Sequence, residues 1–193
     1  MENNSPPVPQ IIVISGSNGA GKSTIARRLL PATMEYVNAD EIAKELAGIV
    51  TEGINMRAGR LALQRLDELE AQRADIAVET TLASRTLAAR IRRLMASGYR
   101  FSLYYVWVPN PELSIARVAE RVRNGGHNIP EEVIRRRYKS GLANFFNIYQ
   151  PIADRWRLYD NSDLSNPAII ARGVLQVKNH LLWKQLQEGN ING

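Results

Sequence analysis

The chain has 193 residues, of which 45% are hydrophobic and 23% are charged, a composition that fits one globular domain with a full core. It has no cysteine, which excludes disulfides and thiolate metal sites, and its apolar runs are too short to span a membrane. The net charge of +6 is compatible with two kinds of partner, nucleic acids and phosphorylated small molecules.

Predicted strands and helices alternate along the chain. Apolar runs bounded by glycine, proline or polar residues predict strands at residues 10–15, 35–38, 75–79, 99–108 and 157–159. Amphipathic patterns predict helices from the first glycine-rich turn to residue 30 and at 40–49, 53–73, 86–96, 112–123, 131–147 and 167–187. The start of the chain resembles no signal peptide, so we expect a cytoplasmic protein with flexible ends at residues 1–9 and 188–193. The alternation predicts a single α/β domain with a five-stranded, mostly parallel sheet and helices on both faces.

A glycine-rich motif connects the first predicted strand to the first helix. It reads G-x-x-x-x-G-K-S and consists of Gly16, Ser17, Asn18, Gly19, Ala20, Gly21, Lys22 and Ser23. In such a loop, backbone N–H groups surround phosphate oxygens, Lys22 reaches the β- and γ-phosphates, and Ser23 binds Mg²⁺. Thr24 belongs to the same predicted nucleotide-binding set, although it suits helix packing better. The motif predicts a P-loop NTPase that uses ATP or GTP.

Asp40 follows the second predicted strand. In a sheet of strand order 2-3-1-4-5, its carboxylate would face the acceptor side of the cleft at the carboxyl ends of the strands. There it could accept the proton of a hydroxyl that attacks the γ-phosphate. It could instead cap the helix that follows, and its position alone favours neither role.

Three polar residues, Glu79, Thr80 and Thr81, end the third predicted strand. The carboxylate could orient a water on Mg²⁺ or bind an acceptor hydroxyl, and the threonines could hydrogen-bond a sugar. A plain strand-end turn is the alternative. Ligands of α/β folds gather at this edge of the sheet, so we expect an acceptor-binding role.

Arginines are concentrated between residues 117 and 137. The cluster comprises Arg117, Arg121, Arg123, Arg135, Arg136 and Arg137. Gly125 and Gly126 could hinge the segment, so we expect residues of about 117–140 to form a small helical lid that carries guanidinium groups to the transferring phosphoryl. In that lid, His127 could contact phosphate or acceptor, or cap the loop. A solvated basic surface is the alternative for the whole cluster.

The ordered set of motifs resembles the zeta toxin family. The matching runs are GSNGAGKST at 16–24, VNADEIA at 37–43, AGR at 58–60, VETTLAS at 78–84, RVAERVRNGGHNIP at 117–130, RRRYKSGLANF at 135–145 and LYDNS at 158–162. The resemblance implies a nucleoside-monophosphate-kinase-like core and an enzyme that uses Mg²⁺ and ATP or GTP to phosphorylate a sugar hydroxyl of UDP-N-acetylglucosamine. It also implies a separate antitoxin protein as a possible partner.

The resemblance further implies roles for individual residues. Catalysis would fall to Lys22, Asp40, Arg121 and Arg136, the last chosen among three adjacent arginines. The acceptor would contact Asp40, Arg60, Glu79, Thr80, Thr81, Arg123 and His127. Besides the phosphate loop, the nucleotide would contact Arg117, Asp160, Asn161 and Ser162.

Other functions stay open at this point. A polynucleotide kinase would bind its substrate through the arginines, but few aromatic residues lie among them to stack on bases, so we expect a small-molecule acceptor. That acceptor could also be a dinucleotide or a nucleoside. A nucleotide-binding ATPase without an acceptor is the third alternative.

Overall fold

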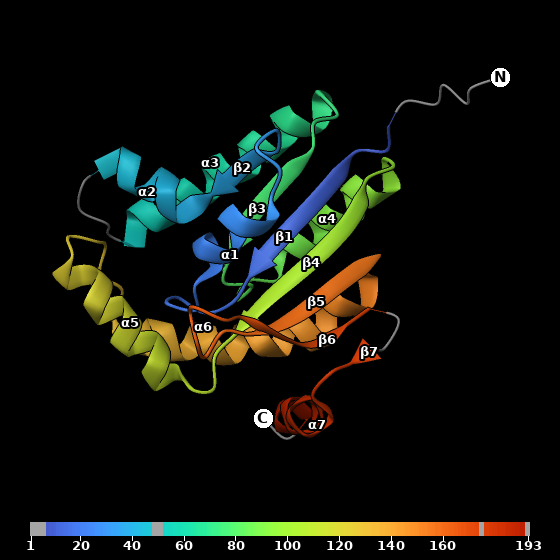
Figure 1. Cartoon of the computed structure of the whole chain (residues 1–193). Helices are drawn as coiled ribbons and strands as arrows, with labels where there is room; N and C mark the ends of the chain where they lie inside the picture. The colour runs from blue at the N-terminus through green and yellow to red at the C-terminus, as the bar shows by residue number, and fades with distance from the viewer. Residues whose placement is uncertain (1–6, 48–51, 174–175, 192–193) are drawn as a thin grey trace.

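The computed structural model describes residues 7–47, 52–173 and 176–191. Its centre is a seven-stranded sheet of order β2-β3-β1-β4-β5-β6-β7 (Figure 1). The first five strands are mutually parallel: β1 (Gln10–Ser15), β2 (Glu35–Asn38), β3 (Ile76–Thr80), β4 (Arg100–Trp107) and β5 (Arg155–Asp160). Two antiparallel strands, β6 (Ala168–Arg172) and β7 (Gln176–Val177), extend the sheet beyond β5. The predicted order 2-3-1-4-5 is confirmed, with two further strands at one edge.

The helices follow the predicted ranges closely except at the end of the chain. They are α1 (Lys22–Leu29), α2 (Ala39–Ala47), α3 (Glu52–Ala71), α4 (Thr86–Ala96), α5 (Pro111–Arg123), α6 (Glu131–Asn144) and α7 (His180–Ile191). The predicted end of the second helix, Ile49, lies outside the described residues. A π-helical turn at Phe145–Tyr149 and a 3₁₀ turn at Gln150–Ile152 continue α6.

Side chains of β1 alternate between two cores, one on each face of the sheet. Ile11 and Val13 belong to the larger core, which includes residues of α3, α4, α6 and α7. Ile12 and Ile14 belong to the smaller core with residues of α1. A strand buried on both faces reads as a continuous apolar run, which is why this segment was recognisable in the sequence.

The predicted helix at 167–187 is wrong, because the chain first forms β6 and β7 there. β6 pairs antiparallel with β5, with Tyr159 opposite Ile169, and so covers an edge that β5 would otherwise expose. Gly173 then packs beside Trp156, whose indole would lie 3.4 Å from an added Cβ. Only from His180 does a helix form, and Trp183 of that helix stacks on Trp156 with ring centroids 5.4 Å apart.

Strand order determines where a ligand can bind. β1 lies between β3 and β4, and the chain leaves it through the glycine-rich loop at the carboxyl edge of the sheet (Figure 1). At such a switch point, neighbouring connections depart toward opposite faces and leave a crevice. Among the described residues, no helix combines the length and the apolar character needed to cross a membrane.

Candidate functional site

The glycine-rich loop is folded tightly against its neighbours. Gly19 has φ +77°, and a Cβ there would approach the carbonyl oxygen of Ser114 to 2.4 Å. Gly16 has φ +141°, and a Cβ there would lie 2.2 Å from the carbonyl oxygen of Val106. Both positions therefore require glycine for their backbone angle and for the lack of space. The loop that the motif predicted has the glycine-dependent geometry of a phosphate cradle.

Lys22 is buried beside this loop. Its Nζ donates to the carbonyl of Ser17 at 3.0 Å and lies 3.9 Å from Oε1 of Glu79. Burial lowers the pKa of Lys22, while the negative charges of Glu79 and Asp40 oppose that shift. The ammonium group is thus held at a place where added negative charge, such as that of a phosphate, would stabilise its protonated form.

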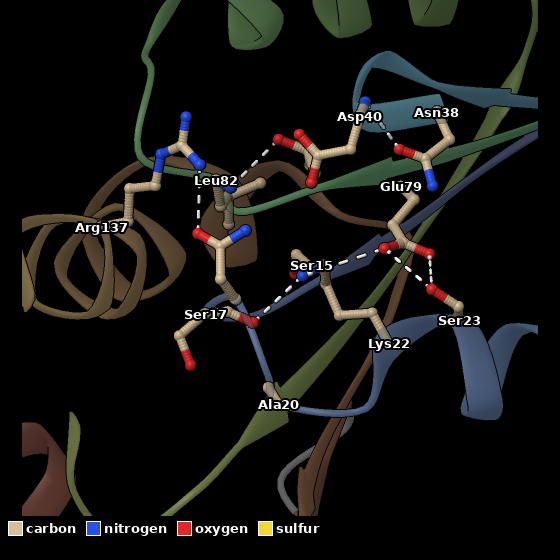
Figure 2. A network of polar contacts seen from close by, with 12 residues as sticks. Ser15, Ser17, Ala20, Lys22, Ser23, Asn38, Asp40, Glu79, Leu82 and Arg137 are labelled. Carbon is tan, nitrogen blue, oxygen red and sulfur yellow. Dashed lines mark hydrogen bonds and ion pairs between the residues drawn. The ribbon is translucent and has the colours of Figure 1, made fainter. Parts of the chain in front are cut away.

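Glu79 lies at the end of β3 and joins the loop to β2. Its two carboxylate oxygens accept from the Ser23 hydroxyl at 2.9 and 3.2 Å (Figure 2). One of them also accepts a short hydrogen bond from the Tyr36 hydroxyl. Burial and, next, the Glu79 carboxylate raise the pKa of Tyr36, so the phenol stays a donor. The carboxylate is therefore orientated from two sides.

A cleft of about 480 Å³ opens above the loop and gathers most of the predicted chemistry. The predicted residues that line it are Asn18, Gly19, Gly21, Lys22, Ser23, Thr24, Asp40, Glu79, Arg117 and Arg121. They come from α1, α2, β3 and α5 as well as from the loop. Residues that are far apart in the sequence thus line one cavity, and its volume suits a small-molecule ligand.

Asp40 lies in the first turn of α2, and Asn38 provides the cap. Oδ1 of Asn38 accepts from the backbone N–H of Asp40 at 3.0 Å, whereas α2 itself begins at Ala39 (Figure 2). The cap is therefore supplied by Asn38, not by Asp40 as the alternative interpretation had it. The Asp40 carboxylate faces the same cleft as Lys22.

Arg117 ties α5 to the predicted nucleotide segment at 160–162. Its guanidinium donates to the carbonyls of Asn161 and Ser162 at 2.9 and 2.7 Å. Asn161 in turn donates from Nδ2 to the carbonyl of Ala20 at 2.6 Å, and Oδ1 of Asp160 accepts from the backbone N–H of Ser162 at 2.9 Å. The segment is thus fastened directly to the phosphate loop.

The return helix α6 brings Arg137, and not Arg136, to the loop. Nη1 of Arg137 donates to Oδ1 of Asn18 at 3.1 Å, while Arg136 is exposed. Of the three adjacent arginines, Arg137 therefore lies nearer to the loop than the predicted Arg136, and a catalytic role for either stays a prediction. The phase of α6 decides this, because Gly141, four residues later on the same face, packs on the carbonyl of Thr81.

Several residues predicted to bind the acceptor are not among those that line the cleft. Arg60 and Arg123 are exposed on α3 and α5. Oγ1 of Thr80 accepts from the backbone N–H of Leu82 at 3.1 Å, which is the strand-end turn considered as the alternative. The carbonyl of His127 accepts from Arg121 at 2.7 Å, so these two residues stabilise the loop between α5 and α6.

Sequence reasoning missed Ser114 and Tyr36. The hydroxyl of Ser114, which is fully buried in α5, lies 2.7 Å from the hydroxyl of Ser17. A serine inside a helix carries no signal of such a contact. Tyr36 could have been suspected, because it stands two residues before Asn38 on the strand next to Glu79.

The described residues include no group of three or more histidines, cysteines and acidic residues close enough to hold a metal on their own. The Ser23 hydroxyl and the Glu79 carboxylate nevertheless lie together beside the loop. Mg²⁺ prefers oxygen ligands and is commonly held by one or two protein groups together with nucleotide phosphates. These residues therefore fit Mg²⁺ arriving with a nucleotide.

Comparison with known proteins agrees with this arrangement. The model of the zeta toxin family matches residues 1–166. A relative from Haemophilus influenzae, described as an uncharacterized protein, is 28% identical over 127 residues, which are 66% of this chain and 91% of that protein.

Solved structures with the same fold are more distant in sequence. A chain of the AvrRxo1-ORF1:-ORF2 complex with ATP has a TM-score of 0.75 at 20% identity. The match covers 92% of the present chain and 63% of the AvrRxo1 complex chain. A chain of the PezAT toxin–antitoxin system of Streptococcus pneumoniae has a TM-score of 0.61 at 17% identity, with 89% of this chain and 74% of that chain covered. A chain of the Pnkp1/Rnl/Hen1 RNA repair complex has a TM-score of 0.58 at 19% identity, with 72% and 46% covered. The fold is that of the P-loop kinases, and this chain belongs to the zeta toxin family.

Proposed function

We propose that this protein is a kinase that transfers the γ-phosphate of ATP or GTP to a hydroxyl of a sugar nucleotide such as UDP-N-acetylglucosamine. The observation that carries the proposal is the shared cleft, in which the phosphate loop forms one wall and Asp40 belongs to the other. Family membership favours the sugar-nucleotide acceptor. Such a reaction would take place in the cytoplasm.

Binding of the triphosphate would rest on the loop and α1. The backbone N–H groups of the loop and the Lys22 ammonium would surround the β- and γ-phosphates. Ser23, with Glu79 beside it, would hold Mg²⁺, which when bound neutralises phosphate charge. Arg117, Asn161 and Ser162 would support the nucleoside end of the same ligand, because they are fastened to the loop.

Transfer would need a base and a cationic clamp. The acceptor oxygen attacks the γ-phosphorus, its proton passes to the Asp40 carboxylate, and the bond between the γ-phosphorus and the bridging oxygen breaks to leave the nucleoside diphosphate. Arg121 lines the cleft, and Arg137 is bonded to Asn18 in the loop. Both guanidinium groups would stabilise the negative charge that spreads over the transferring oxygens.

The lid that closes over the ligands would be shorter than the predicted 117–140. On α5, Ser114 is hydrogen-bonded to Ser17 of the phosphate loop, and Arg117 is hydrogen-bonded to the carbonyl of Asn161. On α6, Arg137 is hydrogen-bonded to Asn18, and Tyr138 to the carbonyl of Val108. Residues 118–136, which lie between these ties, would be the part that moves as a unit. A small core of Val118, Ile129 and Ile134 would hold that unit together.

The acceptor is tested directly by incubation with γ-labelled ATP, Mg²⁺ and separate sets of nucleotide sugars, dinucleotides, nucleosides and short oligonucleotides. The proposal predicts label on a nucleotide sugar and no label with Lys22→Ala. Label on an oligonucleotide end would favour a polynucleotide kinase, and release of free phosphate alone would favour an ATPase. Two structural relatives come from two-component complexes, so a separate antitoxin remains part of the proposal.

A further inference from the structure

Tyr36 stands on the edge strand of the sheet and reaches across to the site. In the parallel pairing of β2 with β3, Asn38 lies opposite Glu79, and Tyr36 lies opposite Ala77. Side chains two residues apart on a strand point to the same face, so Tyr36 and Asn38 share the face that carries the Glu79 carboxylate. Tyr36 and Glu79 are therefore diagonal neighbours across the two strands, a separation that a long side chain can span. The Tyr36 hydroxyl donates a hydrogen bond to Oε2 of Glu79.

The Glu79 carboxylate has little freedom in this arrangement. It is 8% exposed, and the Ser23 hydroxyl binds it from the side of the phosphate loop. The Tyr36 hydroxyl binds it from the side of β2. Hydrogen bonds to an ionised carboxylate are stronger than neutral ones, and two donors from different elements fix its plane.

We propose that Tyr36 is a positioning residue that orients Glu79 toward the metal ion bound with the nucleotide; this inference rests on the proposed function. Tyr36 is not among the residues that line the cleft, so its hydroxyl would act on the site through Glu79. Groups that orient the residues around a metal typically change metal affinity 10–100-fold when removed. Tyr36 is 36% exposed and does not belong to the buried core, so removing its hydroxyl should leave the core of the protein intact.

The test is Mn²⁺ binding to the protein with ADP, measured from the electron paramagnetic resonance signal of free Mn²⁺. Tyr36→Phe should raise the apparent dissociation constant of Mn²⁺ on the order of 10–100-fold. Affinity for metal-free ADP and the urea midpoint of unfolding should equal those of the wild type. Tyr99→Phe is the matched control: Tyr99 is 4% exposed, its hydroxyl faces the carbonyl of Leu69 at 3.4 Å, and it should bind Mn²⁺ as the wild type does.

A second variant separates positioning from a structural role. In the Glu79→Gln background, adding Tyr36→Phe should change Mn²⁺ affinity by less than about twofold, because the two residues act as one unit. The inference is overturned if Tyr36→Phe binds Mn²⁺ normally, if its effect persists undiminished in the Glu79→Gln background, or if metal-free ADP affinity falls equally. Wild-type protein that binds no Mn²⁺ with ADP would overturn this inference together with the metal part of the proposed function. Loss of Mn²⁺ in Tyr36→Phe together with a failed acceptor screen would support the inference and refute only the acceptor.

Discussion

Arg137 of α6 donates a hydrogen bond of 3.1 Å to the side chain of Asn18 in the phosphate loop. Its neighbour Arg136 is exposed on the same helix. The two residues have the same side chain and adjacent positions. They differ in the face of the helix on which they lie, because Arg137 faces the loop and Arg136 faces solvent. They form a natural matched pair for testing which arginine serves the transferring phosphoryl.

We predict that Arg137→Ala lowers kcat on the order of 10²–10³-fold, the loss expected when one preorganised donor to the transition state is removed. Arg136→Ala should change kcat by less than about threefold, since exposed surface changes rarely matter. Steady-state kinetics with the acceptor identified in the screen would measure both. Equal losses in the two variants would contradict the assignment.

The surroundings of two glycines, one in the loop and one in α3, predict opposite effects of an alanine substitution. Gly19→Ala should destabilise the protein by about 1–3 kcal/mol, because the backbone has φ +77° and the Cβ would meet the Ser114 carbonyl oxygen at 2.4 Å. Gly59 lies inside α3 with nothing within 4 Å of an added Cβ. Gly59→Ala should therefore stabilise the protein by about 0.5–1 kcal/mol through higher helix propensity.

Urea unfolding followed by circular dichroism would compare the two glycine variants. ATP affinity provides a second readout, because Gly19→Ala should also weaken nucleotide binding and Gly59→Ala should not. A Gly19→Ala protein as stable as the wild type would mean that the loop relaxes more easily than its packing indicates.

A pH dependence is expected from the contact between α3 and α4. Asp67 accepts hydrogen bonds from Arg90 and Arg93, which lower its pKa from 3.8 to about 2. A lowered pKa in the folded state means that the pairs stabilise the fold above pH 3.8 and that this contribution is lost as pH falls toward 2. The Asp67 side chain is 48% exposed, so solvent screening keeps the effect small.

Asp67→Asn should therefore lower the urea midpoint at pH 6, and its difference from the wild type should shrink steadily as the pH falls below 4. Unfolding midpoints measured at several pH values would check this. A difference that stays constant down to pH 2 would show that the ionised carboxylate is not the source of the stabilisation.

Much of the central fold could be predicted because its signals are local. The run at Gln10–Ser15 has four consecutive apolar residues and is followed by a glycine, and the structure has the same strand. The helix at Thr86–Ala96 has an amphipathic pattern that ends before Gly98, and its bounds agree as well. The motif at 16–23 identified the loop because its glycines serve backbone geometry that no other residue permits.

The parts that could not be predicted depend on contacts between distant segments. Ile169 and Ile170 fit a helical stripe as well as a strand, and the exposed edge of β5 decides between them. Which arginine of α6 meets the loop depends on how Gly141 packs on the carbonyl of Thr81. The contact of Ser114 with Ser17 joins residues that lie 97 positions apart, and no local pattern announces it.

The central claim is that Asp40 deprotonates the acceptor hydroxyl across the cleft from Lys22. Asp40→Asn preserves the shape of the side chain, while Glu45→Gln on the exposed side of the same helix is the control. Transfer of label from γ-labelled ATP to the acceptor should fall on the order of 10²–10⁴-fold in Asp40→Asn, with ATP affinity within about twofold of the wild type. Full transfer activity in Asp40→Asn, or an equal loss in Glu45→Gln, would contradict the account.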